Sequence, residues 1–165
     1  KDWVIKSEGI TTVVLASPFD YLDKVIRFKD GSERKITIDE LNNQFTSTLD
    51  FFVERGIRPV VFTPPPETGK NIGKCLTSSS FFYESYKQCD FEVSEITERQ
   101  KEIYAWLDKV ADKYKVIDLV KVICQDKKCS THNGNTYIYR DMHHLSYEGS
   151  RELGKNFDFY KLISE

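Results

Sequence analysis

The residues best suited to chemistry lie in one short segment near the C-terminus, 140–146. In this segment Asp141 precedes His144 by three residues, in a chain that has only three histidines. A carboxylate at this spacing, in a turn that leads into a helix, can orient the imidazole as a general base. Such a base activates a nucleophile by accepting its proton. We expect Ser146 to cap the following helix instead, because a capping hydroxyl is committed to backbone amides.

Other polar side chains of this region are weaker candidates for a catalytic or binding role. His143 is interpreted as a loop residue beside the catalytic pair, and His132 as a solvated turn residue. Arg140 is a candidate contact for an anionic group of a substrate, with a structural ion pair as the alternative. A metal site built from these histidines and Asp141 is not favoured, because adjacent histidines point in different directions. We therefore predict no metal and no cofactor.

The four cysteines fall into two local pairs, Cys75 with Cys89 and Cys124 with Cys129. Neither pair has the two-residue separation that is usual in zinc knuckles. The spacing therefore favours two disulfides over a metal site, and disulfides indicate the periplasm, the cell exterior or the secretory lumen. Four reduced cysteines in a cytosolic protein are the alternative.

The elements that must position these residues alternate between strand and helix. Apolar runs predict buried strands at 11–16, 59–63 and 115–119. Helical periodicity predicts helices from Asp39, as N-cap, to Gly56, from about 94 to 113, and from 146 to 162. Asp30-Gly31 between two apolar runs, 25–28 and 35–38, predicts a small β-hairpin.

This order predicts an α/β fold, a three-layer α/β/α arrangement with a mostly parallel central sheet. Ligands of such sheets bind beyond the carboxyl ends of the strands, so the loops after Ala16, Thr63, Leu119 and Tyr139 are the candidate site. The length of 165 residues predicts a single domain over 1–165. The net charge is only −2, without a basic face that has interleaved aromatic residues, which argues against nucleic acid as a partner.

Several segments together resemble the SGNH (GDSL-like) hydrolase superfamily. The segment 141–146 is similar to its last block, in which Asp-x-x-His supplies the acid and base of a Ser-His-Asp triad. The resemblance extends to the strand 13–16, the strand that ends in Thr63 and three prolines, and the cysteine loop 123–129. It is closer to one branch, the extracytoplasmic SGNH domains of membrane acyltransferases that O-acylate cell-surface polysaccharide.

The resemblance implies a flavodoxin-like SGNH fold and an O-acyltransferase or esterase activity on acyl esters of cell-surface glycan. Asp141 and His144 would be the catalytic acid and base. The implied partners are the glycan, an acyl donor and a membrane acyltransferase domain in the same or an associated chain. The implied location is outside the cytoplasm, tethered to the inner membrane through a domain that is not in this chain.

The sequence departs from this family at its N-terminal blocks. No Gly-Asp-Ser occurs, the glycine of the second block is not identifiable, and the asparagine of the third is missing near 16–19. We expect the nucleophile and the first strand of the sheet to lie upstream of Lys1, so that the chain as given would be inactive alone. The alternative is a non-catalytic, SGNH-like glycan-binding or interaction domain that lacks the nucleophile.

Overall fold

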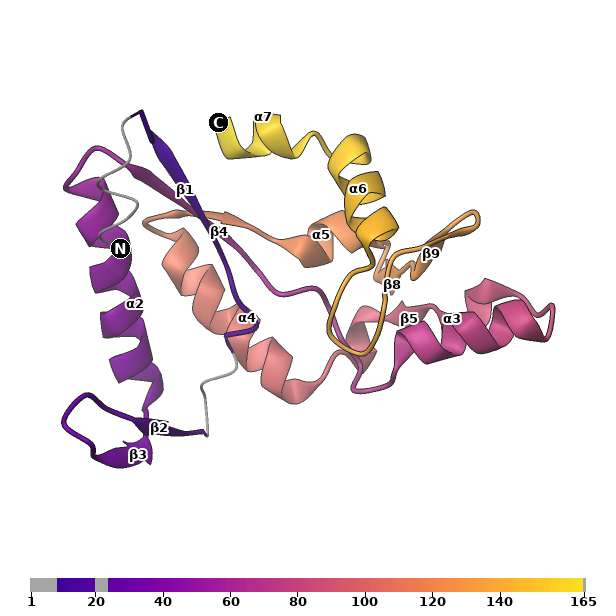
Figure 1. Ribbon diagram of the computed structural model, residues 1–165, viewed down its shortest axis with the longest axis horizontal. Coiled ribbons are helices and arrows are strands. Elements are labelled where there is room, and N and C mark those ends of the chain that lie inside the picture. Colours follow the sequence, from indigo (N-terminus) through magenta and orange to yellow (C-terminus); the bar gives the residue numbers. More distant parts are fainter. Residues whose placement is uncertain (1–8, 20–23, 165) are drawn as a thin grey trace. The chain divides into compact units, whose positions relative to one another are not determined.

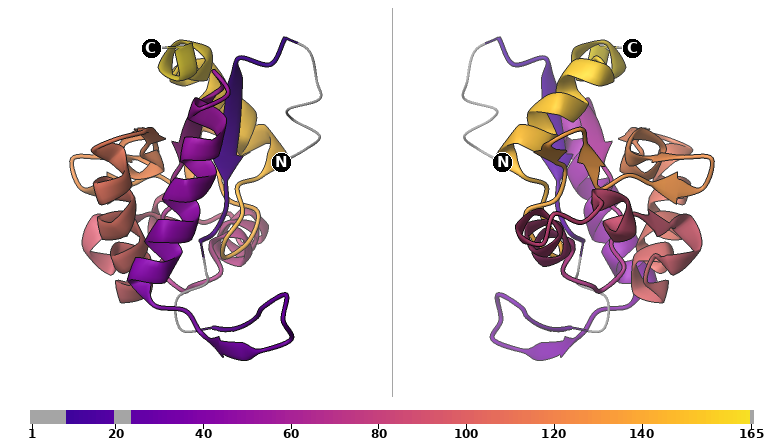
Figure 2. Two further views of the ribbon diagram at one scale, coloured as in Figure 1. Left: turned by 90° about the vertical axis from the view of Figure 1, so that its left-hand side faces the viewer. Right: turned by 90° about the vertical axis from the view of Figure 1, so that its right-hand side faces the viewer.

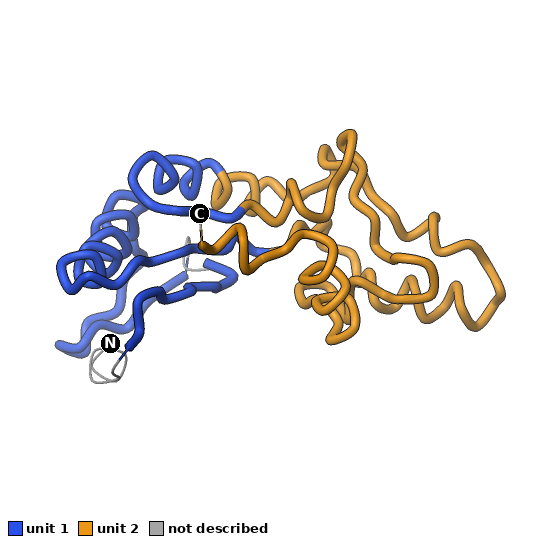
Figure 3. Tube along the Cα trace, turned by 90° about the horizontal axis from the view of Figure 1, so that it is seen from above, with its two compact units in different colours: residues 1–64, 105–117 blue, residues 65–104, 118–165 orange. Residues whose placement is uncertain are grey.

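The structure is a computed structural model that describes residues 9–19 and 24–164 (Figure 1). The chain forms two compact units, coloured separately in Figure 3. Unit 1 comprises Lys1–Pro64 and Ala105–Ile117, and unit 2 comprises Pro65–Tyr104 and Asp118–Glu165. The single domain expected for 1–165 stays a prediction. Within the described residues, no helix is both long and apolar enough to cross a membrane.

Unit 1 is built on a parallel three-stranded sheet. Its strands are β1 (Thr12–Ala16), β4 (Arg58–Phe62) and β6 (Lys115–Ile117), in the order β1-β4-β6. The central strand β4 carries Val60 and Val61, both of which are fully buried. The sequence predicted all three strands and their parallel pairing. The third strand ends two residues earlier than expected, because the Asp118 side chain caps a following helix.

The predicted hairpin is also present in unit 1. Strands β2 (Val25–Arg27) and β3 (Glu33–Lys35) pair antiparallel around the turn at Asp30 and Gly31. Gly31 has a φ of 84°, a left-handed conformation that glycine adopts without strain. The second strand lies earlier than the predicted 35–38, because Thr37 already begins the next helix.

Helix α2 (Ile38–Val53), the long purple helix of Figure 2, contacts β4. Its buried residues are Leu41, Leu49 and Phe52. Thr37 caps it: the Thr37 hydroxyl accepts from the Glu40 amide, and the Glu40 carboxylate accepts from the Thr37 amide. The prediction that Asp39 is the cap was therefore wrong, since this reciprocal capping box satisfies two backbone donors two residues earlier.

Three aromatic rings close the core of unit 1. Phe19, Phe45 and Trp106 pack edge to face, with ring centroids 5.2 to 5.5 Å apart. Trp106 lies in α4 (Glu98–Ala111), and its indole N–H donates to Oδ1 of Asn42 at 3.1 Å. The indole is therefore both buried and hydrogen-bonded, as a core tryptophan requires.

Unit 2 consists of short elements. They are α3 (Ile72–Phe81), η1 (Tyr86–Cys89), β5 (Phe91–Glu92), η2 (Val93–Glu95), α5 (Leu119–Ile123), β7 (Cys124–Gln125), β8 (Lys128–Cys129), β9 (His132–Asn133), β10 (Thr136–Tyr137), α6 (Tyr147–Asn156) and α7 (Phe159–Ser164). The strands form two small antiparallel sheets, β5-β8-β7 and β10-β9. Because these sheets are small, unit 2 depends on buried apolar side chains, such as Leu76, Phe91 and Tyr139, together with covalent and polar links between its elements.

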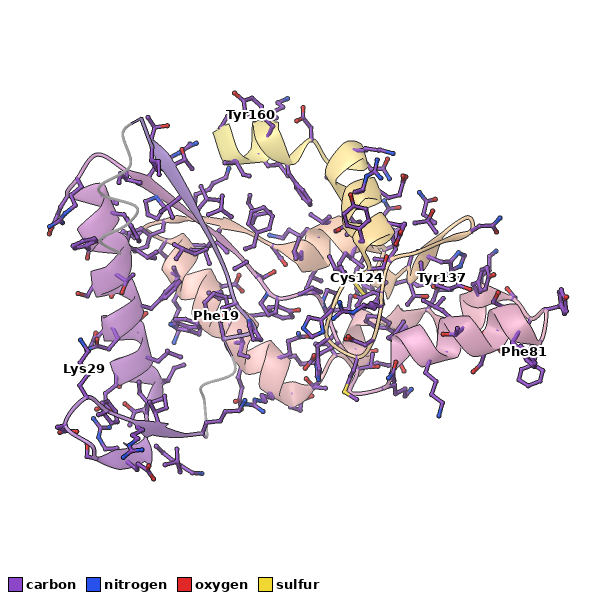
Figure 4. All side chains as sticks on the ribbon, in the orientation of Figure 1. Phe19, Lys29, Phe81, Cys124, Tyr137 and Tyr160 are labelled. Carbon is purple, nitrogen blue, oxygen red and sulfur yellow. A yellow bond between two sulfur atoms is a disulfide. The ribbon has the colours of Figure 1, made fainter. Side chains whose placement is uncertain are left out.

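Both predicted disulfides lie in unit 2. Cys75–Cys89 joins α3 to η1, and Cys124–Cys129 joins β7 to β8 (Cys124 is labelled in Figure 4). Each disulfide closes a short loop, with sequence separations of 14 and 5 residues. The cross-links therefore stabilise local loops of unit 2 mainly by restricting its unfolded chain.

The helix predictions beyond α2 need correction. Helices α3 and α5 were not predicted. The helix expected from about 94 begins at Glu98, because 93–95 form a 3₁₀ turn and Ile96 is extended, with φ −58° and ψ 136°. The helix expected from 146 to 162 is divided into α6 and α7 by Asp158, whose φ of 42° is left-handed.

Candidate active site

The segment 138–146 of unit 2 forms a closed turn that leads into α6 (Figure 1). The Arg140 amide donates to the His144 carbonyl at 2.9 Å, and the Ser146 amide donates to the Ile138 carbonyl at 2.8 Å. Tyr139 and Leu145 form an antiparallel bridge across the turn. The two ends of the turn are thus paired through the backbone, which fixes the residues between them.

Within this turn the Asp141 carboxylate holds the His144 ring. Nδ1 of His144 lies 3.0 Å from both Oδ1 and Oδ2 of Asp141. A carboxylate only accepts hydrogen bonds, so Nδ1 carries the proton and Nε2 of the neutral ring is the basic nitrogen. Among residues 9–19 and 24–164, Nε2 has no hydrogen-bond partner, and the side chain is 63% exposed. The geometry is that of an oriented general base.

Backbone amides hold Asp141 in its charged form. The His143 amide, first, and then the amide and ring of His144 and the Arg140 guanidinium keep the pKa of Asp141 well below its ordinary 3.8. Oδ1 accepts both amides at 2.9 Å. The carboxylate is therefore ionised across the physiological range and can stabilise an imidazolium ring at His144.

Ser146 is committed to the backbone, as predicted. Its hydroxyl donates to the Tyr137 carbonyl and accepts from the Gly149 amide at 2.8 Å, which makes it the N-cap of α6. With both functions engaged, this hydroxyl is not available as the nucleophile. The predicted location of the nucleophile, upstream of Lys1, lies outside the described residues.

A second imidazole and carboxylate pair lies beside the first. Nδ1 of His143 is hydrogen-bonded to Oε2 of Glu67, with side-chain exposures of 57% and 23%. The rings of His143 and His144 are nearly perpendicular, with centroids 6.4 Å apart. Sequence reasoning missed Glu67. Its only local signal is its position in the loop after Thr63, one of the loops that the fold predicted as part of a site.

Buried contacts fix the loop that contains Glu67. Gln100, which is 4% exposed, accepts from the Glu67 amide at 2.7 Å and donates to the Pro65 carbonyl at 2.8 Å. The Tyr139 hydroxyl donates to the Pro66 carbonyl at 2.8 Å, and Tyr139 is 1% exposed. Burial raises the pKa of Tyr139, so its hydroxyl remains a donor. The turn and this loop are thus joined through the interior of unit 2.

Helix α3 also contacts the turn 138–146, through the backbone at Gly73. An ideal Cβ at Gly73 would lie 1.8 Å from the Arg140 carbonyl oxygen and 2.9 Å from the Asp141 amide nitrogen. Only a residue without a side chain permits this approach of the two backbones. The first turn of α3 is therefore in direct contact with the backbone of the candidate catalytic turn.

The remaining predicted residues lie as follows. Arg140 directs Nε to Oδ2 of Asp141 at 3.2 Å, and its side chain is 65% exposed. His132 lies in β9, where Nδ1 is 3.2 Å from the Gly134 carbonyl oxygen. In the described ranges, no three His, Cys, Asp or Glu side chains are grouped so as to hold a metal ion. Asp141 and His144 are thus brought together, and His132 is engaged in a separate turn.

Comparisons with known proteins identify the family and the fold. A family model described as "SGNH domain (fused to AT3 domains)" matches residues 1–159. The periplasmic domain of the lipopolysaccharide acetyltransferase of Salmonella ser. Paratyphi A is similar in structure, with a TM-score of 0.57 and 20% identity. The match covers 92% of this chain and 57% of that one, so this chain spans little more than half of that structure. At this identity the likeness shows the fold, an SGNH-like α/β/α architecture. No curated protein matches the sequence.

Proposed function

Since the chain belongs to the family of SGNH domains fused to AT3 domains, we propose that it transfers or hydrolyses acyl esters of cell-surface glycan. One observation carries the proposal. Asp141 holds Nδ1 of His144 through both carboxylate oxygens, while Nε2 is free of hydrogen bonds within the described residues. This is the arrangement that a base needs in acyl transfer through an activated hydroxyl.

The proposed reaction has two steps. A serine outside residues 1–165, upstream of Lys1, attacks the acyl carbonyl of the donor while Nε2 of His144 takes the hydroxyl proton. His144 then returns that proton to the leaving group, which departs and leaves the acyl group on the serine. In the second step a glycan hydroxyl or water attacks the acyl carbonyl and gives its proton to His144, which returns it to the serine oxygen as the bond between the acyl group and the serine breaks. Asp141 stabilises the imidazolium in both steps.

The cellular setting is part of the proposal. The disulfides support a compartment outside the cytoplasm, and the similar Salmonella domain is described as periplasmic. The AT3 fusion of the family supports a membrane acyltransferase domain as partner and tether. We propose that this partner supplies the acyl donor and that the glycan is the acceptor. Arg140, which is 65% exposed, is available to an anionic group of either substrate.

The test uses the full-length protein and two measurements, hydrolysis of 4-nitrophenyl acetate and O-acyl content of the surface glycan. We expect His144→Ala to lower both by about 10²–10⁴-fold, because a positioned general base contributes about that much. Thermal unfolding should stay close to that of the parent, since the His144 side chain is exposed. Asp141→Asn should lower both activities as well, because the amide no longer stabilises the imidazolium.

His132→Ala is the matched control, because it removes an imidazole from a separate turn of unit 2. It should leave both activities close to those of the parent. Unchanged hydrolysis and O-acylation in His144→Ala would remove the catalytic role. That result would favour the alternative, a non-catalytic domain that binds or presents glycan.

A further inference from the structure

We infer that His143 is a second substrate-contacting residue of this site and that it binds the glycan acceptor. The inference rests on the proposed function. Its starting observation is the repetition of one arrangement: His143 and His144 are each held at Nδ1 by a carboxylate, from Glu67 and Asp141 respectively. The two rings are neighbours, with centroids 6.4 Å apart. One oriented imidazole suffices as the general base, so the second requires another explanation.

A purely structural role explains the pair poorly. The His143 side chain is 57% exposed, and ion pairs as exposed as this contribute little to stability. The turn is already held by the buried hydrogen bond from Tyr139 to the Pro66 carbonyl and by the backbone contact at Gly73. What the Glu67 carboxylate adds is a fixed orientation and tautomer for the exposed His143 ring.

The tautomer determines what His143 can bind. The Glu67 carboxylate accepts, so Nδ1 donates, and Nε2 of the neutral His143 ring is left as a hydrogen-bond acceptor. Nε2 has no partner among the described residues. Its complement is a hydrogen-bond donor, and the hydroxyl group is the abundant donor of a carbohydrate.

Proton balance identifies which hydroxyl this is. The attacking hydroxyl has one proton, and in the proposed reaction His144 takes it. His143 therefore binds a different hydroxyl of the acceptor, next to the one that is acylated. Water, the acceptor in hydrolysis, has no such neighbouring hydroxyl. His143 thus favours transfer to glycan over hydrolysis, and Glu67 is the positioning residue that acts through it.

The experiment compares transfer with hydrolysis in the full-length protein. O-acyl groups on extracted surface polysaccharide are measured by NMR from cells that carry each variant, and the purified variants are assayed on 4-nitrophenyl acetate. We expect His143→Ala to lower the ratio of O-acylation to hydrolysis about tenfold, the effect of one lost hydrogen bond to substrate. Glu67→Ala should lower the ratio in the same direction. Glu67→Gln should restore most of it, because its amide oxygen still accepts from Nδ1.

Two controls separate this inference from the proposed function. His132→Ala should leave the ratio unchanged, whereas His144→Ala should abolish both activities. If His144→Ala does so but His143→Ala lowers both activities equally, or neither, the acceptor-binding role is overturned and the proposed function stands. His143→Gln is the second variant should His143→Ala unfold at a lower temperature. An equal loss of both activities in His143→Gln also contradicts the inference.

Discussion

The two units of this protein both bury apolar side chains, but they differ in sheet architecture and in covalent cross-links. Unit 1 has a parallel sheet, the long helix α2 and buried apolar side chains such as Leu49, Val60 and Trp106. Unit 2 contains all four cysteines as two disulfides, together with polar contacts between loops, such as those of Gln100 and Tyr139. Unit 2 also buries apolar side chains, such as Leu76 and Phe91, so what distinguishes it is the two disulfides that it adds to apolar burial.

The difference bears on function because the candidate site lies in unit 2. Asp141, His144, Glu67 and His143 all stand on loops or turns, where a catalytic side chain is exposed but must still be held in place. Backbone contacts, capping hydroxyls and cross-links provide that support. Substitution of buried side chains should therefore mainly lower the free energy of unfolding, whereas substitution at the contacts that hold the site loops of unit 2 should mainly displace the candidate catalytic side chains.

The largest expected effect on stability comes from Trp106→Ala in unit 1. It removes a side chain that is 3% exposed and packs against Phe19 and Phe45. It also leaves Oδ1 of Asn42 without its hydrogen-bond donor. We expect the free energy of unfolding to fall by about 3–5 kcal/mol. Urea unfolding followed by far-UV circular dichroism measures this change.

Phe81→Ala is the aromatic control for Trp106→Ala. Phe81 lies at the end of α3 in unit 2, is labelled in Figure 4 and is 77% exposed. Its substitution should change the free energy of unfolding by no more than about 0.5 kcal/mol. A loss at Phe81 as large as that at Trp106 would show that burial of the ring does not determine the cost of its removal.

The next largest effect is expected from Gly73→Ala, which tests the backbone contact between α3 and Arg140 in unit 2. A Cβ at this position would lie 1.8 Å from the Arg140 carbonyl oxygen, so α3 or the candidate catalytic turn must move. We expect a cost of about 1–3 kcal/mol, typical of overpacking. We also expect hydrolysis by the full-length protein to fall by about 10²-fold, because small misplacements of a catalytic group are this costly. Urea unfolding and the 4-nitrophenyl acetate assay give the two values.

Gly154→Ala is the matched glycine control in unit 2. Its Cβ would meet only the Phe159 ring, at an ordinary 3.8 Å, and alanine in helix α6 should stabilise it by roughly 0.5–1 kcal/mol. Hydrolysis should stay at the parental level. Full activity in Gly73→Ala would show that the contact of α3 with Arg140 does not position the turn.

The difference between buried apolar runs and elements without such a pattern explains which parts of the fold the sequence could predict. Strands β1, β4 and β6 are apolar runs, and such runs are the dominant local signal, so the strands of this sheet were predicted to within two residues at each end. Helix α3 carries no such pattern, because three of its residues are serines, which are weak helix formers. The Asn71 cap and the Cys75–Cys89 disulfide stabilise this helix, and neither appears as periodicity.

The candidate site was predicted where its contacts are local. Asp141 and His144 interact across three residues, so the spacing alone brings them together. Glu67 and His143 are 76 residues apart, and their pairing depends on the folded loops of unit 2. No pattern within either segment identifies the other.

The smallest expected effect concerns charge, and it compares one carboxylate from each unit. In unit 1 the Arg34 guanidinium, first, and the Thr37 amide lower the pKa of Glu40 from 4.5 to about 2. In unit 2 the pKa of Asp141 is lowered below 3.8, with the backbone amide of His143 as the first cause. Both pKa values are depressed by folding. Each ionised group therefore stabilises the protein above its ordinary pKa, and that contribution is lost as the pH falls through the folded value.

Substitution of each side-chain partner should separate the two causes. Arg34→Met should return the pKa of Glu40 most of the way from about 2 toward 4.5, because its main partner is a side chain. His144→Ala should leave most of the lowering at Asp141, since the amides of His143 and residue 144 remain in place at 2.9 Å. NMR titration of the two carboxyl carbons measures both values. If the pKa of Asp141 instead returned to 3.8 in His144→Ala, the imidazole would be what keeps the carboxylate charged. The present contacts predict instead that the backbone amides alone keep the Asp141 carboxylate charged.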